Sequence, residues 1–466
     1  MTDREIRERW ETLLYPERFR DSKGNKTVDY KEDKYPRNPF DSDFSRITLS
    51  SPFRRLQDKA QVFPLEKNDF ARTRLTHSVE VSGLARSIGV SVENILHKKD
   101  YIVSDKIGHI PSILSVAGLI HDIGNPPFGH FGEDTIKLFF KNLFKNNAPI
   151  DFHDKLIPQE RADFEKFDGN VQGLRILLRL GLTKDEYSYN LTFPTLSSII
   201  KYPYASTNID GSNSNTKYGY FQSDKDRFND INIKLELDGK RHPLVFLLEA
   251  ADDIAYSVSD IEDGCKKGTI TWEILMDTLK SKQYESDHKC KKLASELEEI
   301  NKELTNSKFP SKLLLIAQEC RIKIQIQMIP DIIKVFMDNH EKILNGEFTN
   351  ELLEKSDSHL LRCFTKEIAK YNFNSKSVAK MELLGENVLT YLLEIFVSAV
   401  LSEDRFDSGT KNGKLFNLIS GYYKYRYNQS KYSKDLYNRL MLVTDYISGM
   451  TDTYALTLYH ELLGLE

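Results

Sequence analysis

Apolar residues recur at helical spacing along most of the chain. In residues 76–90, 111–123, 243–260 and 382–401 they stand at positions i, i+3, i+4 and i+7, which gives a helix one apolar face. Only residues 233–237, IKLEL, alternate apolar and polar side chains as a half-buried strand does. We therefore predict a mainly α-helical protein in which β structure is limited to a minor hairpin.

Two polar stretches interrupt this pattern. Residues 203–217, PYASTNIDGSNSNTK, are crowded with Asn, Ser, Asp and Gly, which favour turns, so we predict a long surface loop there. Residues 281–309 are charged at nearly every turn and carry only a thin apolar stripe. This second stretch is typical of an exposed helix.

Length and charge limit the classes of protein. A chain of 466 residues with 40% hydrophobic residues can bury a large core, which excludes wholesale disorder. No uninterrupted apolar run approaches the ~20 residues of a membrane-spanning helix, and the N-terminal residues are charged, so we expect a cytoplasmic protein without a membrane partner. The net charge of −4, from 65 basic and 69 acidic residues, shows no general signature of nucleic-acid binding. Any anion site must be local.

Four residues on three predicted helices carry metal-binding chemistry: His77, the adjacent His121 and Asp122, and Asp252. Imidazole and carboxylate groups suit a divalent cation such as Mn²⁺, Fe²⁺, Mg²⁺ or Zn²⁺. Two histidines and two aspartates leave coordination positions open for water and substrate. A single helical histidine is usually a packing residue, so the prediction of a catalytic metal site depends on the combination.

The residues that surround these candidates support the same interpretation. His121 and Asp122 would point in different directions in mid-helix, but Gly124 and the following Asn-Pro-Pro end the helix and let both side chains turn toward one ion. In the third helix, Asp252, Tyr256 and Asp260 are spaced at i, i+4 and i+8 and share a face. Carboxylates buried in so apolar a helix need a cation or hydrogen-bond donors.

Eight blocks of the sequence resemble the HD-domain deoxynucleoside triphosphate triphosphohydrolases, and in particular the bacterial dGTPases. They occur in the order of that family between about residue 50 and residue 456. The HD pair alone also serves other phosphohydrolases, whereas GNPPFGHFGE, YFQS and GMTD are more specific. The blocks are SSPFRRLQDKAQVF, RTRLTHSVEVSGLARSIG, AGLIHDIGNPPFGHFGE, DGNVQGLRIL, TLSSIIKYP, KYGYFQSDKDRF, EAADDIAYSVSDIEDG and DYISGMTDTYAL.

The resemblance implies a multi-helical HD-domain fold in three parts. Residues 1–50 would form an N-terminal arm, and residues 51–275 an HD-domain catalytic core with an inserted loop near 203–217. Residues 276–466 would form a helical C-terminal region that completes the nucleotide pocket and makes oligomer contacts.

The resemblance also implies roles for individual residues. His77, His121, Asp122 and Asp252 match the metal ligands. Asp252 is chosen over Asp253 because the family's ligand is followed at +4 by a tyrosine and at +8 by an aspartate near the sugar. His130 and Glu133 match the catalytic histidine and its acidic partner. The implied substrate-binding residues are Gln61, Val62, Arg74, Asn170, Lys201, Lys217, Tyr256 and Asp260.

These substrate-binding residues suit a deoxynucleoside triphosphate. Arg74 offers a guanidinium fork to phosphate oxygens, and Lys201 and Lys217 add positive charge. The Gln61 amide would bind the 3′-hydroxyl, and Val62 would lie too close to the sugar to admit a 2′-hydroxyl.

The activity implied by the resemblance is hydrolysis of dGTP, or of dNTPs in general, at the α-phosphorus. One divalent metal ion per site, Mn²⁺ or Mg²⁺, would support it, and the products would be the deoxynucleoside and inorganic tripolyphosphate. Bacterial relatives commonly form hexamers, so the resemblance also implies a homo-oligomer. Members of the family respond to single-stranded DNA or to nucleotide effectors, which makes these candidate partners here.

Two alternatives remain at this stage. An HD phosphodiesterase or nucleotidase could use the same metal site on another nucleotide. A nucleic-acid-binding regulator is the other, because residues 422–439, YYKYRYNQSKYSKDLYNR, interleave tyrosines with basic residues. For that stretch we favour an ordinary amphipathic helix or a part of the nucleotide pocket.

Overall fold

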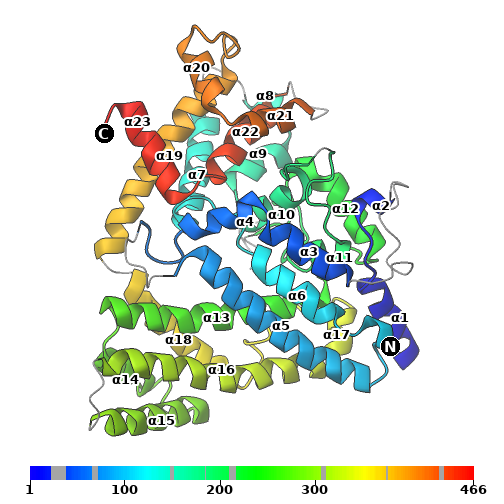
Figure 1. Ribbon diagram of the computed structural model, residues 1–466, viewed down its shortest axis with the longest axis vertical. Coiled ribbons are helices and arrows are strands. Elements are labelled where there is room, and N and C mark those ends of the chain that lie inside the picture. The colour runs from blue at the N-terminus through cyan, green and yellow to red at the C-terminus, as the bar shows by residue number, and fades with distance from the viewer. Residues whose placement is uncertain are drawn as a thin grey trace.

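The computed structural model describes residues 1–22, 38–65, 72–146, 152–183, 185–208, 217–305, 311–373, 376–429 and 435–465. These residues form α-helices α1 to α23 and a few short 3₁₀ turns (Figure 1). Within the described ranges, pairing of extended backbone is limited to three isolated bridges, Arg18–Thr192, Ala60–Thr73 and Ala205–Tyr220. The prediction of a mainly α-helical protein is confirmed.

The strand predicted at residues 233–237 is wrong. Helix α12 (Lys225–Lys234) runs into this segment, and the chain then turns through Glu236 and Asp238, which both adopt positive φ angles near +50°. Leu235 and Leu237 are buried from this turn. The alternating pattern therefore arises from a turn that returns two leucines to the core, and the described residues contain no hairpin.

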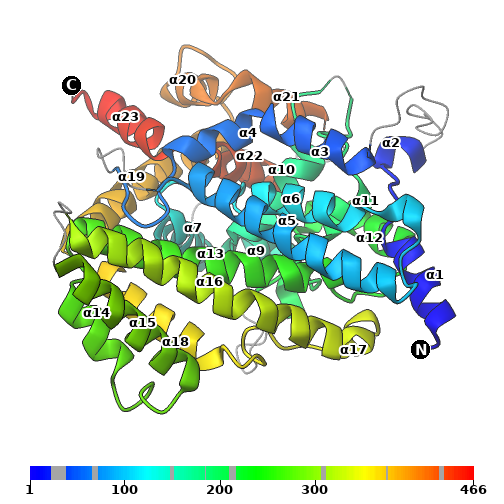
Figure 2. The ribbon, with the colours of Figure 1, turned by 60° about the horizontal axis from the view of Figure 1, so that its bottom comes forward.

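A first group of helices packs around one hydrophobic core in the lower part of the molecule (Figure 1). The long helices α5, α13 and α16 pack against one another, and α6 packs along α5 (Figure 2). The group comprises α1 (Asp3–Leu13), α2 (Phe19–Ser22), α3 (Pro39–Thr48), α4 (Ser51–Arg55), α5 (Arg74–Lys98), α6 (His109–Ile120), α11 (Phe193–Ser197), α12, α13 (Pro243–Lys267), α14 (Trp272–Leu279), α15 (His288–Thr305), α16 (Lys312–Asp338), α17 (His340–Leu344) and α18 (His359–Phe373).

A second group surrounds another core in the upper part of the molecule (Figure 1). Helix α10 contributes side chains to both cores, because Leu174 and Leu177 enter the first and Val171 and Ile176 the second. The second group comprises α7 (Gly129–Asn146), α8 (Phe152–Lys155), α9 (Pro158–Glu165), α10 (Gly169–Arg179), α19 (Lys376–Leu401), α20 (Lys411–Leu418), α21 (Gly421–Gln429), α22 (Leu436–Ser448) and α23 (Asp452–Leu463).

Helix α19 is the most apolar long helix of the second group. Its stretch Val378–Leu401 would suffice by length and composition to cross a membrane, and half of its most apolar window is buried inside the protein. In this structure it packs against α7, α20, α22 and α23. A core helix meets the same criteria, so this feature is weak evidence for a membrane span.

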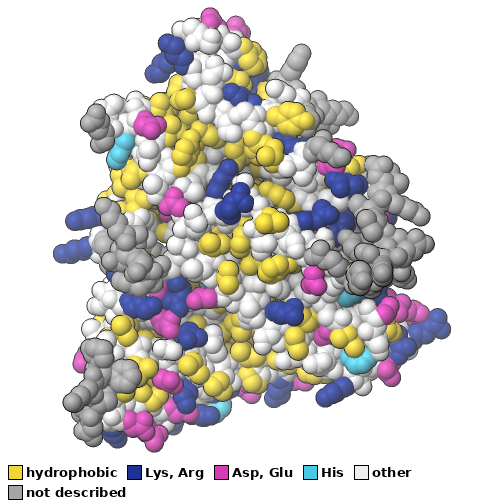
Figure 3. Space-filling view, viewed as in Figure 1, with side chains coloured by type: hydrophobic (Ala, Val, Ile, Leu, Met, Phe, Trp, Pro, Cys, Tyr) yellow, Lys and Arg dark blue, Asp and Glu magenta, His cyan; other side chains and the backbone are white. Residues whose placement is uncertain are grey.

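The four helices predicted from periodicity are confirmed as α5, α6, α13 and α19. The helix expected over residues 281–309 begins only at His288, and residues 306–309 lie outside the described part; its apolar stripe is buried at Leu293 and Leu297. In the predicted loop 203–217, residues 209–216 lie outside the described part. Basic and acidic side chains are interspersed over the face shown in Figure 3, as the near balance of charge leads one to expect.

Candidate active site

A cavity of about 500 Å³ lies where the two groups of helices meet. This volume falls in the range of small-molecule sites. Its wall combines the segment Ala60–Val62 with residues of α5, α7, α10, α13, α18 and α19. Most of the candidate residues from the sequence line this one cavity: Gln61, Val62, Arg74, His77, Asp122, His130, Asn170, Lys201, Lys217, Asp252 and Tyr256.

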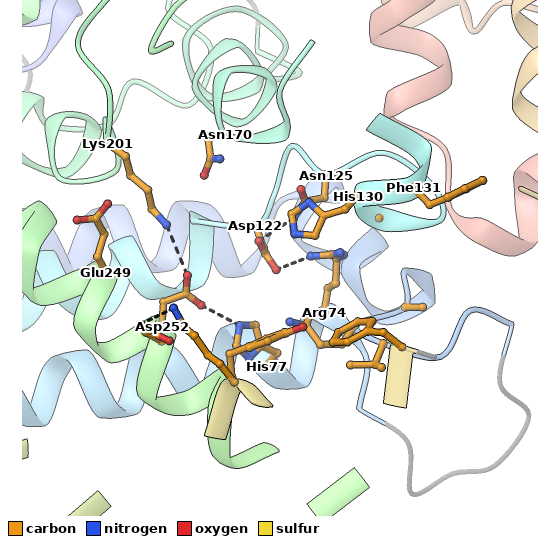
Figure 4. A pocket seen from close by; sticks show the side chains of 18 of the residues that line it. Arg74, His77, Asp122, Asn125, His130, Phe131, Asn170, Lys201, Glu249 and Asp252 are labelled. Atoms are coloured by element: carbon orange, nitrogen blue, oxygen red, sulfur yellow. Dashed lines mark hydrogen bonds and ion pairs between the residues drawn. The ribbon is translucent and has the colours of Figure 1, made fainter. Parts of the chain in front are cut away.

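His77, Asp122 and Asp252 line the cavity and lie near one another there (Figure 4). The ligand atoms of His77, His121 and Asp122 all lie within 4.8 Å of one another. Asp252 Oδ1 lies 3.1 Å from His77 Nε2 and 3.3 Å from His121 Nε2. Helices α5 and α13 and the turn that follows α6 thus bring two imidazoles and two carboxylates to one point, with His77 in the first turn of α5 and Asp252 in the middle of α13.

His121 is oriented for ligation by its own helix end. Helix α6 ends at Ile120 with His121 as its C-cap, and His121 Nδ1 lies 2.8 Å from the Gly118 carbonyl oxygen. A carbonyl can only accept, so Nδ1 carries a proton, and Nε2 is the ring nitrogen that faces the carboxylates of Asp122 and Asp252. That Nε2 atom is buried. A ring nitrogen held between two carboxylates fits a ligand of a bound cation.

The charges of the cluster are set by its neighbours. Burial would lower the pKa of His121, but Asp122 and Asp252 raise it above its ordinary value. Burial would raise the pKa of Asp122, but Arg74 and the two histidines hold it well below its usual range. Arg74 donates to Asp122 Oδ2 at 2.7 Å, so this carboxyl is ionised and ready for a metal ion.

Asp252 and Asp253 face different partners. Burial would raise the pKa of Asp252, but His121, His77 and Lys201 hold it well below its usual range. Asp253 instead forms an ion pair with Arg362 of α18, and Lys366 Nζ lies 3.5 Å from the same carboxylate oxygen. Consecutive helical residues point about 100° apart, so only Asp252 reaches the histidines.

The candidate phosphate-binding residues lie around the metal cluster. Lys201 Nζ lies 3.5 Å from Asp252 Oδ2; burial would lower the pKa of this lysine, but Asp252 and Glu249 raise it, so it stays charged. Asn170 stands on α10 across the cavity (Figure 4). Lys217 is more exposed, and its Nζ lies 3.9 Å from Asp168. Positive charge is therefore available beside the cluster.

The candidate sugar-binding residues form another part of the wall. The Gln61 Oε1 atom is buried and has no hydrogen-bond partner among the described residues, and Val62 is buried beside it. Tyr256 lines the cavity and meets the His77 ring edge to face, with centroids 6.3 Å apart. Asp260 does not line the cavity; it is buried behind Tyr256, and burial raises its pKa well above the usual range.

His130 and Glu133 form a pair at the start of α7. The His130 side chain is 79% exposed, and its Nδ1 lies 3.5 Å from Glu133 Oε2. Glu133 is buried and accepts a 2.9 Å hydrogen bond from the Gly169 amide at the start of α10. Burial would raise the pKa of Glu133, but His130 and Lys137 lower it. The carboxylate therefore stands behind an imidazole that solvent and ligand can reach.

Sequence reasoning missed several residues of this wall. The Asn125 amide donates a 2.6 Å hydrogen bond to Asp122 Oδ1, and Asp168 orients Asn170 by accepting from both its backbone and side-chain nitrogens. Both residues stand inside motifs quoted above, next to assigned positions, so closer attention to those neighbours could have found them. Arg362 and Lys366 of α18 stand in no such motif, and only the tertiary structure brings them to the cavity.

Comparisons with known proteins agree with this geometry. An HD domain model matches residues 74–158, and a phosphohydrolase-associated domain model matches residues 416–461. A deoxyguanosinetriphosphate triphosphohydrolase-like protein of Listeria monocytogenes is 39% identical, over 98% of this chain and 100% of the relative. Another of that name, from Synechocystis sp., is 35% identical, over 98% of this chain and 99% of the relative. A deoxyguanosinetriphosphate triphosphohydrolase of Yersinia enterocolitica is 30% identical, over 93% of this chain and 96% of the relative.

The all-helical fold and the histidine–aspartate cluster thus define an HD-domain phosphohydrolase. Because full-length relatives reach 39% identity, the chain belongs to the deoxyguanosinetriphosphate triphosphohydrolase family, as the sequence blocks predicted. HD domains are metal-dependent hydrolases, and this chain carries a His/Asp cluster suited to that chemistry.

Proposed function

We propose that the protein hydrolyses dGTP, or dNTPs in general, at the α-phosphorus to the deoxynucleoside and inorganic tripolyphosphate. The observation that carries this proposal is the cavity itself. One space of about 500 Å³ is bordered by the His/Asp cluster and by the basic residues Arg74, Lys201 and Lys217. The side chains of Gln61 and Val62 line the same space.

In this proposal His77, His121, Asp122 and Asp252 hold one divalent ion, with Mn²⁺ or Mg²⁺ as the candidates. Such an ion would supply an activated water and neutralise charge on the phosphate that is attacked. The orphaned Nε2 of His121 and the two ionised carboxyls support this donor set.

Arg74 and the two lysines would bind the triphosphate. Arg74 already donates a hydrogen bond from one guanidinium nitrogen to Asp122, and its Nε atom is buried without a partner in the described residues. A phosphate oxygen beside the metal cluster would satisfy that donor, and a guanidinium keeps its charge in such a site. Lys201 and Lys217 would hold the outer phosphates and orient the α-phosphorus toward the cluster.

Gln61, Val62 and Tyr256 would select the deoxyribose. The free Gln61 Oε1 accepts a hydrogen bond from the 3′-hydroxyl, and the Tyr256 ring packs against the sugar. Val62 offers no hydrogen bond to a 2′-hydroxyl, so a ribonucleotide would bury that group unpaired, at a cost of about 1–3 kcal/mol.

His130 would move a proton during cleavage. Its Nδ1 faces Glu133, which leaves Nε2 as the ring nitrogen that can exchange a proton at the reacting phosphate ester. The 3.5 Å separation is long for a hydrogen bond, but catalytic contacts often tighten only when substrate is bound. The buried Glu133 carboxylate would orient the ring through that contact.

The test is a product analysis. Purified protein is incubated with each dNTP and rNTP in the presence of Mn²⁺ or Mg²⁺ in ¹⁸O-labelled water, and products are separated by anion-exchange chromatography. We expect deoxyguanosine and tripolyphosphate in equal amounts, with the label in tripolyphosphate, because water attacks phosphorus and the 5′-oxygen leaves with the nucleoside. Primary release of dGMP with pyrophosphate, or of dGDP with phosphate, would contradict the proposal.

The structure favours this proposal over a nucleic-acid-binding regulator. In the described part of residues 422–439, Tyr423 and Tyr437 are buried, and the Tyr437 hydroxyl donates to Asp163. Arg426 donates to the carbonyl oxygens of Thr183 and Asp185. These side chains serve packing, which agrees with the interpretation favoured from the sequence, while Lys431 and Lys434 lie outside the described residues.

A further inference from the structure

Asp452, the first residue of α23, joins two loops that border the cavity. The side chain is buried, and each of its oxygens accepts a backbone hydrogen bond from a different loop. The Phe128 amide donates to Oδ1 at 2.9 Å, and the Ala60 amide donates to Oδ2 at 3.0 Å. One loop leads into Gln61 and Val62, which would contact the sugar, and the other leads into His130. A single carboxylate therefore holds these two loops together.

Lys59 reinforces the same junction. Its buried Nζ donates to the carbonyl oxygens of Asn125, at 2.5 Å, and of Ser448, at 2.9 Å. The Lys59 carbonyl in turn accepts a 3.0 Å hydrogen bond from the Arg74 amide at the start of α5. The turn between α22 and α23 is thereby connected to both cavity loops and to the helix that carries His77.

The loop that precedes His130 needs such support because its backbone is strained at Phe128. Phe128 has a φ angle of +62°, which residues with a Cβ rarely adopt, and Gly129 follows with a φ angle of +63°. A residue in this region costs of order 1–3 kcal/mol and persists only where its surroundings hold it. The Phe128 ring packs against Gly385 of α19, and Asp452 fixes its amide. These two contacts hold the residue that directly precedes α7 and stands two positions before His130.

We propose that Asp452 is a positioning residue for the nucleotide reaction: it fixes the distance between the sugar-selecting loop at Gln61–Val62 and the loop that presents His130. The effect on turnover rests on the proposed function, whereas the junction itself does not. Since Asp452 and Ser448 fall within residues 416–461, the phosphohydrolase-associated domain orders the active site of the HD domain from outside it.

The test compares Asp452→Asn with wild type and with Asp435→Asn in the full chain. Asparagine keeps the shape of aspartate, but its amide nitrogen cannot accept a hydrogen bond, so one of the two loops loses its partner. Asp435 is a suitable control because it lies in the same C-terminal segment and caps α22 by accepting from the backbone and side-chain nitrogens of Asn438, a role that asparagine fills equally well.

Two measurements are made on each variant. Hydrogen–deuterium exchange should show faster exchange at the Ala60 or Phe128 amide in Asp452→Asn and no change in Asp435→Asn. Kinetics should show kcat for dGTP lowered by roughly 10-fold to 100-fold. The ratio of kcat/KM for dGTP over GTP should fall as the sugar wall moves, with metal content unchanged. Asp452→Glu keeps the charge and both acceptor oxygens and should recover part of both effects.

The outcomes are separable. Equal loss of rate for dGTP and GTP, with the ratio constant and a lower unfolding temperature, would make Asp452 a structural residue only and overturn the proposal. Unchanged exchange at both amides would overturn it as well. Absence of nucleotide hydrolysis by the wild-type protein would overturn the proposed function, and the exchange experiment would still decide whether Asp452 holds the two loops.

Discussion

At the scale of single residues, His130 does not belong to the group of His77, His121 and Asp122 whose ligand atoms lie together. Its nearest carboxylate is Glu133, and its side chain is exposed at the cavity edge. We expect His130→Ala to lower kcat by roughly 10²-fold or more, the usual effect of losing a general acid or base. Metal content should stay unchanged. Single-turnover rates and metal stoichiometry, measured on the same preparation, check this prediction.

Two further variants distinguish a role in proton transfer from a role in metal binding. Glu133→Gln keeps an acceptor for the Gly169 amide but replaces the carboxylate that faces His130 Nδ1 with an amide that orients the ring less well, so kcat should fall in the same direction. His121→Ala should instead lose bound metal, because His121 belongs to the cluster. A loss of metal in His130→Ala would make His130 a ligand, and an unchanged rate would make it a bystander.

At the scale of elements, the metal cluster depends on how closely α5 and α6 approach. Gly118 of α6 lies against the backbone of Ser82 in α5, and a Cβ on Gly118 would come within 2.5 Å of Ser82 Cα. Gly118→Ala must push apart the helices that position His77 and His121. We expect a loss of about 1–3 kcal/mol in the free energy of unfolding and weaker metal binding, measured by denaturant titration and by calorimetric titration with Mn²⁺.

Gly83 supplies the matched control on α5. It is exposed, and no atom lies within 4 Å of the position that a Cβ would take. Gly83→Ala should therefore raise the free energy of unfolding by about 0.5–1 kcal/mol through helix propensity, with metal affinity unchanged. If the two alanine variants behaved alike, close packing of α5 on α6 would not be what places the ligands.

At the scale of the whole molecule, three buried histidines make stability depend on pH. Burial lowers the pKa of His109, His242 and His340 to about 4. Between pH ~6.5 and 4 the unfolded chain binds protons at these sites and the folded protein does not, so stability is lost as the pH falls through this window. Each histidine lowers the free energy of unfolding by at most about 1.4 kcal/mol per pH unit in this window. Calorimetric unfolding at pH 7, 6 and 5, with the wild type compared with a variant that lacks one of these histidines, should show this contribution decline.

His242 offers a way to isolate one of these groups. Its Nδ1 caps α13 by accepting from the Leu244 amide, a role that asparagine can fill without titrating. His242→Asn should therefore flatten the decline, whereas His288→Asn, at a side chain that is 77% exposed, should leave it unchanged. Equal slopes in the two variants would exclude His242 as a contributor.

Residue patterns predicted the helices because their cause is local. The apolar spacing in α5, α6, α13 and α19 is a property of each segment alone, since one helical face must be buried wherever the segment packs. The same criterion failed at residues 233–237, because alternation over five residues also fits a helix end followed by a turn. Over so few residues, the pattern does not distinguish a strand from a turn. The burial of Leu235 and Leu237 in the core determines which of the two forms.

The candidate site divides in the same way. Residue identity and spacing were enough to propose the ligands, because the HD pair, its flanking motifs and the glycine and prolines that end the helix stand in contiguous blocks. The contacts that hold these ligands in place come from segments far apart in the chain. Asp452 reaches Phe128 and Ala60 across 324 and 392 residues of chain, and Lys59 joins Asn125 to Ser448. The physical reason is that a hydrogen bond acts over about 3 Å of space whatever the separation in sequence, and local periodicity contains no record of which distant segments will meet.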